Sequence, residues 1–139
     1  YGLHVEKEER QAFDDALLKQ YSALPVYIDE KTSDLITKDF RTGIISRSEY
    51  FIFIHSTIWP LFHYLPGDID FNNDQWAGYV SANELFADKI ASLVDDGDCI
   101  WIHDYHLMLL PKMLRERCKK NVSIGFFLHI PFPASDVYR

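Results

Sequence analysis

The sequence has 139 residues, the usual size of one domain, and its 47% hydrophobic and 15% aromatic content can form a core. The formal net charge of −7 argues against a nucleic-acid-binding protein, because such binding depends on cations that neutralise phosphates. Polar residues interrupt the apolar runs well before the ~20 residues that a membrane span needs, and two cysteines are too few for a disulfide framework. We therefore expect a soluble cytoplasmic protein that binds neither nucleic acid nor membrane.

The first half of the chain contains few regular patterns. Charged residues mixed with apolar residues at helical spacing predict an amphipathic surface helix over residues 6–20. Residues 24–28 favour a short strand, and residues 29–48 favour loop and short helix. Aromatic and β-branched residues favour a strand over residues 50–58, although a buried helix is an alternative for so short an apolar run.

The second half alternates between helix and strand patterns. Residues 65–68 predict a turn, and apolar residues at every third or fourth position predict a helix over residues 76–94. Residues 99–102 form a continuous apolar run, which is typical of a strand buried on both faces. A helix over residues 107–120 and a second buried strand over residues 122–128 follow. This order predicts an α/β fold, a Rossmann-like domain with a doubly wound parallel sheet.

Polar side chains follow both predicted strands at their carboxyl ends. The first strand is followed by the run His103, Asp104, Tyr105 and His106, and the second strand is followed by His129. Ligands of open parallel sheets bind at the carboxyl ends of the strands. If the two strands are neighbours, ~4.8 Å apart, then Asp104 and His129 open onto the same crevice. This pair is the strongest functional signal in the residues themselves.

Simpler roles stand beside that hypothesis. A polar residue at a strand end can merely cap the next helix or loop, which would explain any one of His103, Tyr105 or His106. Metal binding is a weaker alternative, because His103 and His106 flank Asp104 in a turn and no cysteine or HExxH spacing accompanies them. The motifs of nucleotide-binding loops and of serine hydrolases are absent from the sequence.

An aromatic group upstream offers a second kind of site. Its members are Tyr50, Trp59, His63 and Tyr64. Flat rings can cover the apolar face of a sugar while their polar tips bond its hydroxyls. The alternative is that this stretch simply belongs to the core.

Two motifs resemble those of a known family. They are WIHDYHLMLLP at residues 101–111 and IGFFLHIPFP at residues 124–133, and WPLFHY at residues 59–64 precedes them in the same order. Together they resemble the trehalose-6-phosphate synthase family over residues 49–139. The resemblance implies a retaining glycosyltransferase of the two-lobed GT-B kind, with residues 1–139 as part of a single N-terminal lobe. It also implies transfer of glucose from UDP-glucose to glucose 6-phosphate, without a metal or another cofactor.

The resemblance also assigns roles to residues at matching positions. Tyr50 and Trp59 are expected to line the glucose 6-phosphate pocket. Asp104 is expected to hydrogen-bond the acceptor sugar and His129 to face the transferred glucose, which makes them the expected catalytic pair. The leaving phosphate is expected to take the acceptor proton. The other polar residues of the first motif are expected to form the scaffold that orients Asp104: His103, Tyr105 and His106.

Other features depart from the family. Bulky apolar residues occupy much of 51–55, where the family has small and polar ones, and are expected to change the acceptor pocket. A glycine-containing loop and the second lobe with its phosphate-binding cations have no counterpart, and the sequence starts at Tyr1 rather than Met. We therefore expect a fragment of a longer enzyme that is inactive by itself. The alternative is a regulatory subunit of a trehalose synthase complex, or the N-terminal domain of a trehalose-6-phosphate phosphatase.

Overall fold

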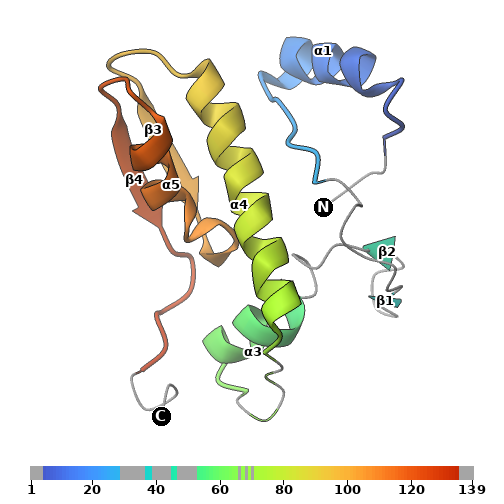
Figure 1. Ribbon diagram of the computed structural model, residues 1–139, viewed down its shortest axis with the longest axis vertical. Coiled ribbons are helices and arrows are strands. Elements are labelled where there is room, and N and C mark those ends of the chain that lie inside the picture. The colour runs from blue at the N-terminus through green and yellow to red at the C-terminus, as the bar shows by residue number, and fades with distance from the viewer. Residues whose placement is uncertain are drawn as a thin grey trace.

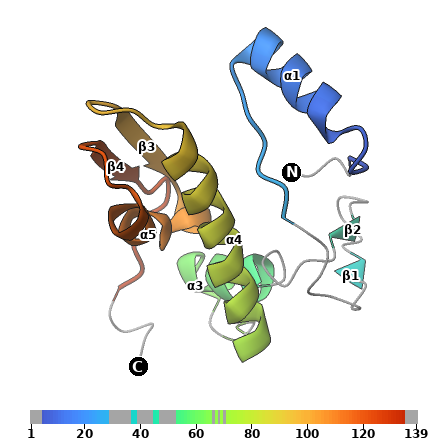
Figure 2. The same ribbon diagram turned by 45° about the horizontal axis from the view of Figure 1, so that its top comes forward.

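The computed structural model describes residues 5–28, 37–38, 45–46, 53–65, 67, 69 and 71–134. Its elements in chain order are α1 (Arg10–Tyr21), β1 (Thr37–Lys38), β2 (Ile45–Ser46), the π-helix η2 (Ile54–Ile58), α3 (Trp59–Phe62), α4 (Asn73–Leu93), β3 (Cys99–His103), the 3-10 helix η4 (Tyr105–Leu107), α5 (Leu110–Arg117) and β4 (Ser123–Phe127). Figure 1 shows β3, β4 and α5 on one side of α4 and α1 on the other. The turned view in Figure 2 keeps this arrangement.

Strands β3 and β4 form the parallel pair that the sequence predicted. Their register runs from Cys99 opposite Ser123 to His103 opposite Phe127, and α5 is the crossover helix between them. Helices α4 and α5 cover one face of this pair. The core between them consists of Ala87, Val94, Ile100, Ile102, Leu110, Leu114 and Val122.

The other face of the two strands is exposed within the described part of the chain. Trp101 is 60% exposed and Phe127 is 48% exposed, so the prediction that these strands are buried on both faces is wrong for the described residues. Trp101 lies across Gly125 on the neighbouring strand, where a Cβ atom would approach the indole ring to 3.1 Å. An apolar face of this kind is typical of a parallel sheet that is covered on both sides.

A second core cluster joins α4 to the helices that precede it. Its buried members are Phe53, Ile54, Ile58, Phe62, Tyr79 and Ala82. Leu128 and Ile130, which follow β4, pack against the same cluster. The chain beyond β4 therefore lies next to η2, α3 and the first half of α4.

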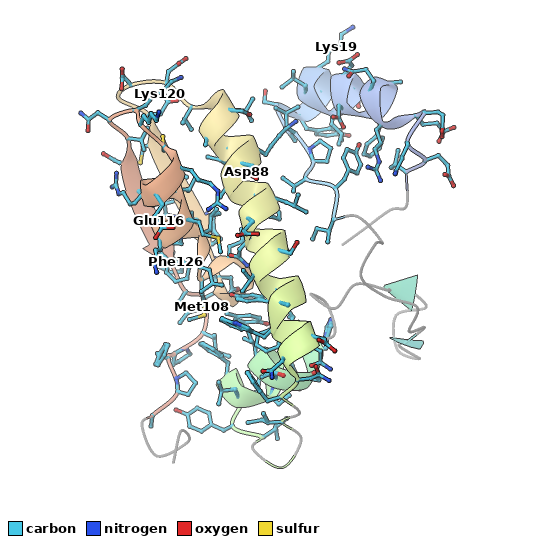
Figure 3. All side chains as sticks on the ribbon, viewed as in Figure 1. Lys19, Asp88, Met108, Glu116, Lys120 and Phe126 are labelled. Carbon is cyan, nitrogen blue, oxygen red and sulfur yellow. The ribbon has the colours of Figure 1, made fainter. Side chains whose placement is uncertain are left out.

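Helix α4 begins at Asn73 rather than at residue 76. The Asn72 side chain accepts a hydrogen bond of 2.7 Å from the backbone N–H of Asp74 and so caps the helix. Near its other end, Asp88 accepts a hydrogen bond of 2.8 Å from the Arg117 guanidinium at the end of α5; Figure 3 labels Asp88 on α4. Core packing between the helices matters more for stability than this exposed ion pair.

Several other sequence predictions differ from the structure. Residues 24–28 form no strand. The predicted strand over residues 50–58 is wrong for residues 53–58, which are helical because Ile54 and Ile58 turn into the core. The predicted helix over residues 107–120 is shorter: η4 and a turn come first, and α5 begins at Leu110 with Pro111 in its first turn. The surface helix is confirmed, because no residue of α1 is buried.

Candidate functional site

The carboxyl ends of β3 and β4 lie side by side at one edge of the sheet. His103 is the last residue of β3 and pairs with Phe127, the last residue of β4. The backbone N–H of Asp104 donates to the Phe127 carbonyl at 2.8 Å, which continues the pairing one residue further. Asp104 and His129 thus both follow strands that end at the same edge. The predicted neighbourhood of the two strands is confirmed.

Asp104 has an unusual backbone conformation. Its φ is 70° and its ψ is 171°, a region that residues with a Cβ rarely adopt and that is often associated with functional sites. Its Oδ1 atom accepts a hydrogen bond of 2.8 Å from the backbone N–H of Tyr105 and so caps η4. Among the described residues, Oδ2 of Asp104 makes no hydrogen bond. The carboxylate therefore caps the turn through one oxygen, and its second oxygen has no partner in the described part of the chain.

Two residues of α4 fix the turn that follows Asp104. The Tyr79 hydroxyl donates to the Tyr105 carbonyl at 2.7 Å and accepts from the backbone N–H of Met108 at 3.1 Å (Figure 3 labels Met108). The Asn83 side chain donates to the His106 carbonyl at 3.3 Å. Both side chains are almost fully buried, and burial raises the pKa of Tyr79 to about 12. The Tyr79 hydroxyl therefore stays protonated and able to donate at neutral pH.

Sequence reasoning assigned no site role to Tyr79 and Asn83. Both stand at apolar positions of the periodic pattern that predicted α4. A hydroxyl and an amide on the buried face of a helix need hydrogen-bond partners, and this requirement was the available signal. It does not say which distant backbone groups those partners are.

The imidazoles of His103 and His129 form a pair at the same edge. Nδ1 of His103 lies 3.0 Å from Nε2 of His129, and the ring centroids are 5.3 Å apart with the planes inclined by 30°. The Phe127 ring meets the His129 ring edge-on at 4.8 Å. His103 therefore contacts His129, whereas the resemblance suggested a role in orienting Asp104.

His106 and Tyr105 belong to the turn rather than to the sheet edge. Their rings stack at 4.5 Å, and Tyr105 also meets Phe62 of α3 at 5.4 Å. Partial burial lowers the pKa of His106, while the negative charge of Asp104 acts in the opposite direction. His106 is therefore mainly neutral at neutral pH, which fits a scaffold role.

The aromatic group on and after α3 is exposed. Trp59 is 38% exposed and Tyr64 is 52% exposed, so the alternative that these residues simply belong to the core is wrong for them. The His63 ring stacks on Trp59 at 4.3 Å, and His63 Nδ1 donates to the Trp59 carbonyl at 2.7 Å. The Tyr64 hydroxyl accepts from the backbone N–H of Ala134 at 3.0 Å. These contacts bring α3 to the chain that follows His129.

Residues 50–54 precede the aromatic residues of α3, and the structure describes only the last two of them. Tyr50, expected in the acceptor pocket, lies outside the described residues, as do Phe51 and Ile52. Phe53 and Ile54 are 3% and 2% exposed in the core. Their bulk therefore serves packing, and the expectation that it alters an acceptor pocket has no support from these two residues.

Within the described ranges, no group of three or more His, Cys, Asp or Glu side chains is arranged to hold a metal ion. No helix among the described residues is both long and apolar enough to cross a membrane.

Comparison with protein families gives a match along the whole chain. The model of glycosyltransferase family 20 matches residues 1–139. The alpha,alpha-trehalose-phosphate synthase (UDP-forming) of Emericella nidulans is 49% identical over 141 aligned residues, which cover 99% of this chain and 25% of that protein. The chain thus spans about a quarter of the length of the curated relatives that it matches.

Solved structures match the fold as well. A trehalose-phosphate synthase from Burkholderia xenovorans in complex with glucose-6-phosphate superposes with a TM-score of 0.60 at 35% identity, covering 74% of this chain and 24% of that one. An E. coli structure bound to UDP-2-fluoro glucose gives a TM-score of 0.61 at 39% identity, covering 76% of this chain and 26% of that one. The predicted α/β fold, part of the first Rossmann-like lobe of a GT-B architecture, is confirmed.

Proposed function

Because this chain belongs to glycosyltransferase family 20, we propose that the protein carrying it transfers glucose from UDP-glucose to glucose 6-phosphate, with release of UDP. Residues 1–139 would be a single Rossmann-like part of its N-terminal lobe, and the product would be trehalose 6-phosphate. The relatives named above are UDP-forming synthases, and two similar structures hold glucose-6-phosphate and a UDP-sugar analogue. These likenesses support both substrates.

The observation that carries the proposal is the placement of Asp104. Its carboxylate stands at the carboxyl edge of the parallel pair, where ligands of such sheets bind. One oxygen is used by the turn, and the other is available to a sugar hydroxyl. Tyr79 and Asn83 hold the turn after Asp104 through hydrogen bonds to its backbone. A side chain that orients a substrate needs such a fixed position.

We assign the acceptor sugar to Asp104 and the transferred glucose to His129. Transfer with an oxocarbenium-like transition state needs the acceptor hydroxyl held at near-attack distance on one face of the donor sugar. A carboxylate and an imidazole on adjacent strand ends can hold the two sugars in that relation. Asp104 then acts by orientation, since the leaving phosphate can take the acceptor proton.

Trp59 and Tyr50 are proposed to line the glucose 6-phosphate pocket. The exposed Trp59 ring, stacked on His63, presents a flat apolar surface of the kind that binds a sugar face. Tyr50 keeps this role by its motif position alone. No resident metal or cofactor enters the proposal.

We propose the cytoplasm as the location of the protein, on the evidence of its two cysteines. Cys99 and Cys118 are both free thiols, which fits a reducing compartment such as the cytoplasm.

The remaining lobe of the enzyme, and further subunits of a trehalose synthase complex, would be the partners of this chain. Phe53 and Ile54 of the divergent segment serve the core, so these two residues lend no support to the regulatory or phosphatase-linked alternative.

The test uses the full-length protein that carries this chain. It is incubated with UDP-glucose and glucose 6-phosphate, and mass spectrometry is used to detect UDP and trehalose 6-phosphate in equal amounts. Calorimetry with each substrate separately gives a second readout. Binding without product, or phosphate release from trehalose 6-phosphate without synthesis, would contradict the proposal in favour of the alternative.

A further inference from the structure

The hydrogen bond between His103 and His129 has no part in the proposed function, which gives a role to His129 but none to His103. The His103 and His129 side chains are both exposed; His103 ends β3, and His129 lies two residues beyond the end of β4. Their facing nitrogens are 3.0 Å apart. Such a contact requires one nitrogen to carry a hydrogen and the other to be a bare acceptor. The tautomer of one ring therefore fixes that of the other. If both rings were protonated, two N–H donors would face each other.

The strands around the pair limit how its rings can move. His103 is held in register opposite Phe127, and the Phe127 ring stands edge-on against His129 at 4.8 Å. Trp101, two residues earlier on the same face of β3, lies 6.2 Å from the His103 ring. The His129 imidazole is thus constrained by one ring edge and by one hydrogen bond. Of these contacts, only the hydrogen bond couples the tautomer of His129 to that of His103.

We propose that His103 is a positioning residue for His129: its Nδ1–H donates to Nε2 of His129, which leaves the hydrogen of that imidazole on its own Nδ1 and fixes its tautomer and tilt. Nδ1 of His129 is then left with one defined hydrogen-bonding role toward a sugar hydroxyl. This inference rests on the proposed function in assigning the sugar to His129. The hydrogen bond between the two rings stands apart from that assignment.

The test compares two variants of nearly equal shape in the full-length protein. His103→Leu removes the hydrogen-bonding atom, whereas His103→Asn keeps an amide near the position of Nδ1 that can donate or accept. We expect kcat to fall about tenfold in His103→Leu, the effect of losing one neutral hydrogen bond in the transition state. The KM for glucose 6-phosphate should change less than about twofold, and His103→Asn should recover most of kcat. An unchanged kcat in His103→Leu would overturn the inference, and equal losses in both variants would do the same.

A spectroscopic readout separates this inference from the proposed function. In protein labelled with ¹⁵N-histidine, the ring signals of His129 are assigned by their loss in His129→Gln. One tautomer is expected in the wild type and in His103→Asn, and averaged nitrogen shifts are expected in His103→Leu. The same His129 shifts in His103→Leu as in the wild type would overturn the inference. If the wild type makes no trehalose 6-phosphate, the proposed function fails, and the nitrogen shifts still decide whether His103 fixes the tautomer.

Discussion

Replacing Tyr79 by Phe removes one hydroxyl and two hydrogen bonds from the turn behind Asp104. The Tyr105 carbonyl loses its donor at 2.7 Å, and the Met108 N–H loses its acceptor at 3.1 Å. Each such bond contributes about 1 kcal/mol net, and buried groups left without a partner cost somewhat more. Tyr79 is 1% exposed, so water cannot easily replace the hydroxyl. We expect the turn to lose about 2 kcal/mol of local stability.

Hydrogen exchange measures that loss directly. A loss of about 2 kcal/mol corresponds to roughly thirtyfold faster exchange of the Met108 amide when exchange follows local opening. The measurement is made on the full-length protein, by mass spectrometry of peptides that cover residues 104–109. Tyr21→Phe is the matched control: Tyr21 is 73% exposed, and its variant should exchange like the wild type. Unchanged exchange at Met108 in Tyr79→Phe would refute the idea that this hydroxyl fixes the turn.

Three further predictions concern the core, the pH dependence and the isolated chain. The Leu114 side chain is 0% exposed, and Leu114→Ala should lower the free energy of unfolding by about 3 kcal/mol in urea titrations. The control Leu93→Ala, at a residue that is 51% exposed, should lower it far less. Equal losses in the two variants would contradict the assigned core. Burial raises the pKa of Tyr79 from 10.0 to about 12, so the folded state holds this proton more tightly than the unfolded state. The contribution of this group to the free energy of unfolding is complete below pH 10 and is lost as the pH rises towards 12. Tyr79→Phe should abolish this loss of stability between pH 10 and 12. The same dependence of stability on pH in the variant and the wild type would contradict the assignment. A polypeptide of residues 1–139 alone should make no trehalose 6-phosphate, and detectable product would contradict a requirement for the rest of the enzyme.

The second half of the fold could be predicted because its signals are local. The period of three and four that marks α4 comes from side chains on one helix, and the continuous apolar run of β3 reflects the strand itself. The order of helix and strand then fixes a parallel pair with a common edge. Asp104 and His129 could be placed at that edge from sequence, because their position depends only on where the strands end.

The errors occurred where distant contacts decide the structure. Residues 53–58 have strand propensity, but Phe53, Ile54 and Ile58 gain more by packing in a helical arrangement against Tyr79. Whether the second face of β3 and β4 is covered depends on segments outside these strands, and the apolar pattern within the strands does not specify those segments. The bonds from Tyr79 to the turn span 26 and 29 residues, and no periodicity encodes them. The same holds for the contact between the two histidines.

The turnover number of Asp104→Asn in the full-length protein tests the central claim, that this carboxylate orients the acceptor sugar. Asn tolerates a positive φ and can cap η4 through its own side-chain oxygen, so the variant removes the charge and keeps the turn. We predict that kcat with UDP-glucose and glucose 6-phosphate falls at least about tenfold, which corresponds to a loss of about 1.4 kcal/mol in transition-state stabilisation. A normal turnover number in a folded Asp104→Asn variant would contradict this account of the site.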